Sequence, residues 1–165
     1  MMKGTKRYTP RKAMDTATDP YLNRQSPREN SVCRQCGAVF HNKRWYTSEQ
    51  ARPQAGKGGI DVLCPACQKI KDRFVGGVVT LTGRFLAEHR DEILKLIYNK
   101  EERSKQYNPL GRIISIHDMK DRIEITTTTD KLAQRIGQVL NKTYQGKVTY
   151  KWSDDVKLAR VQWSR

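Results

Sequence analysis

The spacing of apolar residues in the second half of the chain predicts a helix that leads into a small mixed domain. Between residues 82 and 106, side chains that can face a core fall mostly three or four positions apart, which is the repeat of a helix: Phe85, Leu86, His89, Ile93, Leu96 and Ile97. Asn108-Pro109 should end this helix, because proline disfavours helical conformation in the residue before it.

From residue 110 onward, short stretches alternate between apolar and polar residues, as strands do when one face is buried. Two of them lie around residues 113–116 and 122–128, with the sequence HDMKD as a hairpin turn between them. A helix should follow, capped by Asp130 and ended by Gly146. Two further strands should cover residues 148–152 and 159–163, joined by a turn at 153–155. This order predicts an α+β domain of ββαββ type, with an antiparallel sheet and the helix on one face.

The first 109 residues divide by composition into three further parts. Residues 1–32 contain three prolines among polar residues and no sustained apolar repeat, so we expect a disordered basic tail. This tail either becomes ordered on RNA or stays solvated without a partner. The remaining parts are a four-cysteine zinc module at residues 33–74, a connecting helix at 75–109 and the ββαββ domain at 110–165.

Composition and charge exclude several classes of protein and indicate one kind of partner. Lys and Arg number 32 against 17 Asp and Glu, which gives a net charge of +15. An excess of this kind is typical of proteins that bind nucleic acid or an anionic membrane surface. No apolar run approaches the ~20 residues that span a bilayer, and the basic N-terminus lacks the apolar segment of a secretory signal. We therefore expect a cytoplasmic protein with reduced thiols.

The strongest chemical signal is a pair of C-x-x-C motifs, formed by Cys33 with Cys36 and by Cys64 with Cys67. The two-residue gap lets both sulfurs of a pair reach one ion, and two pairs complete a tetrahedral shell of four thiolates. This pattern predicts a structural Zn²⁺ site, although four thiolates also suit iron. Four sulfur ligands leave no position for a catalytic water, so metal-dependent hydrolysis is not expected.

Other interpretations of these motifs stay open at the level of sequence. The cysteines could form a redox dithiol or carry no ligand, and His41 could replace one of them as a ligand. A redox C-x-x-C usually lies near a βαβ pattern, which is not apparent in this sequence. The sequence AGKGG at residues 55–59 lacks the spacing of a Walker phosphate loop. It is either a basic loop that contacts phosphates or a plain linker.

Basic residues beside the cysteine pairs and in the last strands form the predicted nucleic-acid interface. Lysine attracts phosphate, arginine adds forked hydrogen bonds, and an aromatic ring can stack on a base. Trp45 could equally pack against the metal module, which is the expected place of Phe40. The predicted contact residues are Lys43, Arg44, Trp45, Arg52, Lys57, Lys69, Lys71, Arg73, Lys147 and Lys151.

Several stretches of the chain resemble a known family. They span residues 33–165 and read CRQCG, CPAC, HRDEILKLI, NPLGRI, IEITTTTDKLAQRIGQVL, VTYKW and ARVQW. These stretches are similar to those of bacterial relatives of the NMD family of ribosome-associated proteins, which includes the eukaryotic large-subunit export adaptor and its archaeal homologues. The resemblance implies zinc at the four cysteines and association with ribosomal RNA or the large ribosomal subunit.

The chain also departs from that family. The export adaptor has more cysteine pairs and further domains, whereas this chain has two pairs, so nuclear export does not carry over. No residue supports the role in mRNA decay that is sometimes attached to the family name. We therefore expect a non-enzymatic zinc protein that binds ribosomal RNA and acts in ribosome stability or assembly. The alternatives are a zinc-containing DNA-binding transcriptional regulator and a nuclease that would use Asp154 and Asp155, or Asp118 and Asp121.

Overall fold

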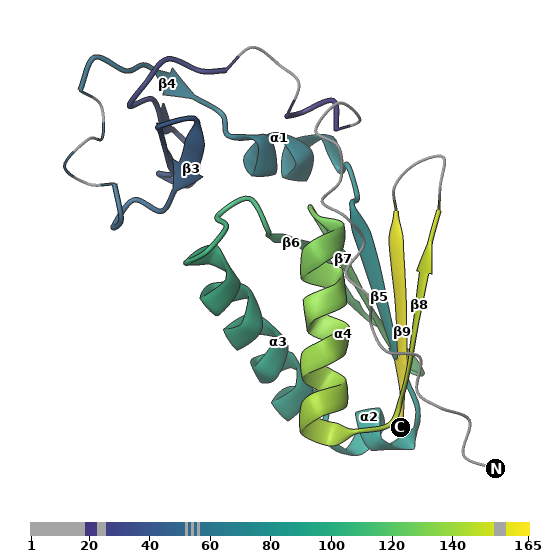
Figure 1. Ribbon diagram of the computed structural model, residues 1–165. Helices are drawn as coiled ribbons and strands as arrows, with labels where there is room; N and C mark the ends of the chain where they lie inside the picture. Colours follow the sequence, from purple (N-terminus) through teal and green to yellow (C-terminus); the bar gives the residue numbers. More distant parts are fainter. Residues whose placement is uncertain (1–18, 23–25, 52, 54, 56, 154–157) are drawn as a thin grey trace.

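The computed structural model describes residues 19–22, 26–51, 53, 55, 57–153 and 158–165, which form two sheets and four helices (Figure 1). A small sheet that carries the cysteines lies above one end of a larger unit of helices and sheet. The predicted α+β class is therefore confirmed, as is the gathering of the four cysteines. No helix within the described residues combines the length and the apolar character needed to cross a membrane.

The small sheet has the strand order β3-β2-β1-β4. Its strands are β1 (Val32–Cys33), β2 (Val39–His41), β3 (Arg44–Tyr46) and β4 (Asp61–Val62), and helix α1 (Pro65–Asp72) follows. Asn42 and Lys43 have φ angles of 48° and 62°, as in the two-residue turns that match the twist of a hairpin. β1 pairs antiparallel with β2 but parallel with β4, so the segment after β1, which contains Cys36, and the segment after β4, which contains Cys64, begin at the same end of neighbouring strands.

The larger sheet has five strands in the order β6-β7-β5-β9-β8. They are β5 (Gly77–Thr82), β6 (Ile113–Asp118), β7 (Arg122–Thr127), β8 (Lys147–Trp152) and β9 (Ala159–Ser164). The two strands, helix and two strands predicted for residues 110–165 are present, and the pairs β6–β7 and β8–β9 are antiparallel as predicted. The first two residues of the predicted HDMKD turn belong to β6, and the turn itself covers residues 119–121. β5 lies between the two pairs and pairs antiparallel with β7 but parallel with β9.

β5 is the central strand, although its residues lie in the range expected for the connecting helix. Two glycines, Gly76 and Gly77, lead into this strand and lie against the start of the last helix. A Cβ at Gly76 would lie 2.5 Å from the carbonyl oxygen of Thr128, and one at Gly77 would lie 2.5 Å from Ala133 Cβ. The two glycines therefore allow β5 to approach the start of α4 closely. This close approach explains why the strand begins with residues that are rare in strands.

The helices differ from the predicted ones at their ends. The helix expected over residues 82–106 is two helices, α2 (Arg84–Glu88) and α3 (Arg90–Lys105), which meet at His89 with φ of −123°. The N-cap of α4 (Asp130–Tyr144) is Thr129 rather than Asp130, because the Thr129 hydroxyl accepts a hydrogen bond from Leu132 N–H at 3.2 Å. α3 and α4 run side by side, and α4 packs on the large sheet (Figure 1).

The main core lies between α4, α3 and one face of the large sheet. Alternate strand residues point into it, so the predicted two-residue period holds for β7 and β9. Trp163 is buried there and donates its indole N–H to the Gln145 carbonyl at 2.8 Å. The buried members are Val79, Leu81, Leu86, Ile93, Ile97, Ile123, Ile125, Leu132, Ala133, Ile136, Leu140, Val161 and Trp163.

Part of the segment predicted to be a disordered tail belongs to the fold. Asn30 N–H donates to the Phe40 carbonyl at 2.8 Å, and β1 begins at Val32. The Tyr21 hydroxyl donates to an Asp72 carboxylate oxygen at 2.9 Å. The boundary at residue 32 is therefore too late. Residues 1–18 and 23–25 of the predicted tail lie outside the described residues, as do the predicted turn positions 154 and 155.

Candidate functional site

Two tight backbone turns position the four cysteines. After Cys33 the chain folds back, so that Gly37 N–H donates to the Cys33 carbonyl at 2.8 Å. Gly37 has a φ of 76°, in the left-handed region that glycine adopts without strain. Cys64 is the N-cap of α1 and Cys67 lies in the first turn of that helix, with Pro65 at its start. These two turns bring the members of each pair to the same point.

The four sulfur atoms lie within 4.8 Å of one another, and those of Cys36 and Cys64 are 3.7 Å apart. Two sulfurs that each lie ~2.3 Å from one tetrahedral zinc ion would be about 3.8 Å apart. Cys33, Cys64 and Cys67 are buried, Cys36 is half-buried, and all four thiols are free. The predicted cysteine cluster is confirmed as a group that could hold one metal ion.

Hydrogen bonds and burial set the ionisation of these sulfurs. The backbone N–H of Cys64 donates to Cys33 Sγ at 3.3 Å, and that of Cys67 donates to Cys64 Sγ at 3.4 Å. A hydrogen bond with Cys64 lowers the pKa of the Cys36 thiol to about 4, and the same bond together with burial raises the pKa of Cys64. Burial, together with the charge of Cys36, raises the pKa of Cys67 to about 12. Four thiolates at this spacing need a compensating cation, so the donor set fits a metal ion.

His41 is not part of the cysteine cluster. Its Nδ1 lies 3.0 Å from Asn30 Oδ1 and 3.3 Å from Glu29 Oε2. The ligand atoms that gather at one point are those of the four cysteines. The alternative in which His41 replaces a cysteine ligand is therefore wrong.

The predicted basic contact residues of the cysteine module lie in several places. Lys43 and Arg44 are exposed at the β2–β3 hairpin, and Lys57 is exposed in the loop before β4. Lys71 and Arg73 are exposed at the end of α1. Arg52 lies outside the described residues. The hairpin residues and the α1 residues are therefore separate surface positions on one module.

Lys69 does not belong to the surface. Its side chain is 7% exposed, and its ammonium lies 2.6 Å from Asp19 Oδ2 and donates to the Thr128 carbonyl at 3.3 Å. The sequence places Lys69 between exposed cations, but it shares the buried side of α1 with Ala66 and Cys67. The prediction that Lys69 contacts nucleic acid is corrected, because its charge is already paired.

The two aromatic side chains of the hairpin behave differently. Phe40 is 6% exposed, as expected of a residue that packs into the module. Trp45 lies edge-to-face against Phe40, with ring centroids 5.4 Å apart, and it packs against the cysteine cluster. Trp45 also lines a groove beside the cluster, and its stacking on a base stays a prediction.

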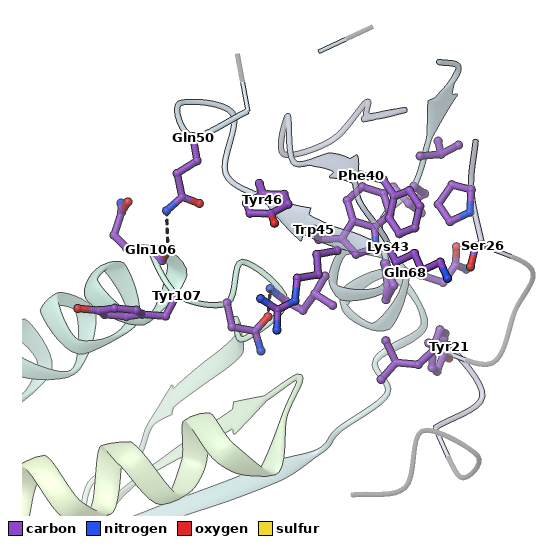
Figure 2. Close-up of a pocket in the computed structure, with 18 residues that line it drawn as sticks. Tyr21, Ser26, Phe40, Lys43, Trp45, Tyr46, Gln50, Gln68, Gln106 and Tyr107 are labelled. Carbon is purple, nitrogen blue, oxygen red and sulfur yellow. Dashed lines mark hydrogen bonds between the residues drawn. The ribbon is translucent and has the colours of Figure 1, made fainter. Parts of the chain in front are cut away.

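This groove has a volume of about 960 Å³ and runs between the hairpin, α1 and the end of α3 (Figure 2). Gln50 donates its side-chain N–H to the Gln106 carbonyl at 2.7 Å across one end. Leu110 packs against the cysteine cluster, so the large unit supplies part of the wall. Lys43, Arg44 and Trp45 were predicted here, whereas the sequence analysis missed Tyr46, Gln50, Gln106 and Tyr107. Tyr107 is exposed, and its position directly after a helix was the sequence signal that could have indicated it.

The face of the large sheet opposite the core is basic. Strand register places Lys147 in one cross-strand row with Ser164, Thr82 and Arg122. Another row holds Lys151, Arg160, Val78 and Thr126, and the row between them contains Glu124 as its acidic residue. We call Arg122, Lys147, Lys151 and Arg160 the basic face; all four are exposed, and none is in an ion pair with another described residue.

Comparison with family models, with curated proteins and with solved structures found no match to this chain. We therefore infer function from the cysteine cluster, the groove and the basic face.

Proposed function

We propose that this chain is a zinc-containing protein without catalytic activity that binds RNA, with ribosomal RNA of the large subunit as its partner in the cytoplasm. The observation that supports RNA binding most is the basic face. Lys151 lies directly opposite Arg160 on the neighbouring strand, and like charges in that position are destabilising by themselves. A bound phosphate would offset this repulsion, which gives the pair a function as a phosphate contact.

Zinc is proposed for the cysteine cluster because four thiolates from two C-x-x-C pairs form the usual closed shell of a structural site. The buried apolar residues that share the described cluster with the sulfurs are Ala38 and Ala66, and Trp45, Leu63 and Leu110 are partly buried against it. The module buries few large apolar side chains, Val39 and Phe40 among them, so metal binding would add to its folding free energy.

A catalytic role has little support from the acidic residues. The Asp118 carboxylate is ion-paired with Arg90, and its predicted companion Asp121 is exposed beyond the end of β6. Asp154 and Asp155 lie outside the described residues. The choice of ribosomal RNA rests on the resemblance of residues 33–165 to the NMD family, and the role in ribosome stability or assembly is part of the same proposal.

Sedimentation through a sucrose gradient tests this proposal. The tagged, full-length protein should co-migrate with large ribosomal subunits at low salt and leave them as salt rises, because each neutralised phosphate releases counterions. A protein that stays at the top of the gradient at low salt would refute the proposed partner. Preference for genomic duplex DNA over ribosomes in competition would favour the DNA-binding alternative instead.

The double variant Lys147→Glu/Lys151→Glu tests the basic face itself. Loss of two phosphate contacts should weaken binding about tenfold and flatten the slope of log affinity against log salt by about 2. The matched control is Lys95→Glu/Lys131→Glu, which makes the same change in net charge at exposed positions of α3 and α4. Equal effects of both doubles would show that only net charge matters.

A further inference from the structure

We propose that the groove beside the cysteine cluster binds unpaired nucleotides of RNA, by stacking bases on its aromatic rings while Lys43 and Arg44 hold the phosphates. This inference rests on the proposed function, since it assigns the part of the RNA that this groove would recognise. The basic face would then hold the phosphate backbone nearby.

The composition of the groove is the first argument. It is lined by five aromatic residues, four side-chain amides and two cations, and by no carboxylate among the described residues. Aromatic rings stack on bases without regard to sequence, and amides can hydrogen-bond to base edges. The members are Tyr21, Phe40, Trp45, Tyr46 and Tyr107 as aromatics, Gln50, Gln68, Gln106 and Asn108 as amides, and Lys43 and Arg44 as cations.

The exposure of these side chains is the second argument. Tyr107 is 87% exposed at the end of α3, where it packs into no core. On the opposite side, Lys43 and Arg44 are exposed on the hairpin, and neither is in an ion pair with another described residue. Figure 2 shows Tyr107 at the α3 end of the groove with its ring directed away from Trp45 and Lys43, which lie at the hairpin. The groove is therefore bordered by an exposed ring on one side and by exposed cations on the other.

The chemistry of the groove, more than its size, favours a chain over a single small molecule. Its volume of about 960 Å³ lies within the range of about 300 to 1,000 Å³ of small-molecule sites. An unpaired stretch of RNA supplies flat rings and regularly spaced anions, which match the rings and cations of the groove. Paired RNA would not enter, because its bases are stacked on one another and their faces are covered.

The large sheet does not offer the same chemistry. Its basic face consists of Lys and Arg among Ser, Thr and Val side chains, and the aromatic residues of β8 and β9 point to the core side. Tyr150 and Trp163 thus pack inward with the core. The groove combines the exposed ring of Tyr107 and the half-buried rings of Trp45 and Tyr46 with the exposed cations Lys43 and Arg44.

The test compares a fluorescent single-stranded RNA octamer with an RNA duplex of the same sequence, using the full chain loaded with zinc. Tyr107→Ala should weaken octamer binding by about 5- to 150-fold, because one stacked base contributes ~1–3 kcal/mol. Duplex binding should change little. The matched control is Tyr98→Ala, which removes an exposed tyrosine of α3, the helix before Tyr107, that does not line the groove.

A second variant, Lys43→Gln/Arg44→Gln, tests the phosphate contacts. It should reduce the salt dependence of octamer binding by a slope of about 1.4, since each contact to a single strand contributes ~0.7. If Tyr107→Ala and the double variant both bind the octamer like the unmodified protein while ribosome binding persists, the groove inference is overturned and the proposed function stands. If neither ribosomes nor any RNA bind the unmodified protein, both proposals fail.

Discussion

The side chain of Lys69 joins three parts of the chain that are far apart in sequence. Its ammonium contacts the Asp19 carboxylate and the Thr128 carbonyl, and it lies 5.7 Å and 5.8 Å from the ring centroids of Tyr21 and Phe74. A buried cation is costly to desolvate, so these partners must offset that cost together. Lys69 therefore links α1 of the cysteine module to the backbone just before α4.

Asp19→Ala should lower the free energy of unfolding by about 3 kcal/mol, because it leaves the buried ammonium without its carboxylate. Urea denaturation of the full chain measures this change. Asp61→Ala is the control, since it removes an exposed carboxylate that has no ion pair with another described residue. The double variant Asp19→Leu/Lys69→Met should recover most of the loss, and a double as unstable as Asp19→Ala would contradict this account of the pair.

At the scale of elements, α4 approaches the large sheet closely at Gly137. A Cβ there would lie 2.6 Å from Val161 Cγ1 and 3.3 Å from Cε1 and the hydroxyl oxygen of Tyr150. Helix propensity alone predicts that alanine stabilises this position by ~1 kcal/mol, whereas the contact predicts overpacking that costs ~1–3 kcal/mol. The distance of 2.6 Å to a buried side chain indicates that the contact outweighs the propensity.

Gly137→Ala should therefore destabilise the protein by about 1 kcal/mol, read as a lower urea midpoint at constant slope. Thr143→Ala is the matched substitution on the same helix, because Thr143 is exposed and alanine there gains propensity without a clash. Thr143→Ala should raise the urea midpoint of the protein slightly. Stabilisation by both substitutions would show that α4 can move away from β9 at little cost.

Most elements of the large unit could be predicted from the sequence. Alternation and helical spacing predicted β6, β7, α4, β8 and β9, because each of these buries one face against the same core. β5 was not predicted. Its hydrogen bonds to a strand on each side depend on the whole sheet, and its first residue is a glycine, which favours close packing but is rare in strands. The cysteine cluster was predicted because the two-residue spacing within each pair is visible in the sequence. The groove was not predicted, because Gln50 and Tyr107 come to line one groove only through the tertiary fold.

At the scale of the whole molecule, the two units depend on different sources of stability. The large unit buries thirteen apolar side chains in one cluster. The cysteine cluster buries three cysteines and two alanines, and its strands add the buried side chains of Val39 and Phe40, so the module has the smaller core and a bound ion would contribute to its stability. The groove is formed by both units, and it therefore depends on the unit that has the weaker core.

Removal of the metal by a chelator should therefore uncouple the units instead of unfolding the chain. In hydrogen exchange, the amides of Cys33 and Phe40 should lose protection, whereas those of β5 and β9 should keep it. Single-stranded RNA should lose its site in the groove while the basic face still binds duplex RNA.

Cys36→Ser should reproduce these effects without a chelator, and added Zn²⁺ should restore the chelated protein. Unchanged protection of Cys33 and Phe40 in metal-free protein would show that the small sheet needs no ion, and loss of protection in β5 would show that the two units are not independent.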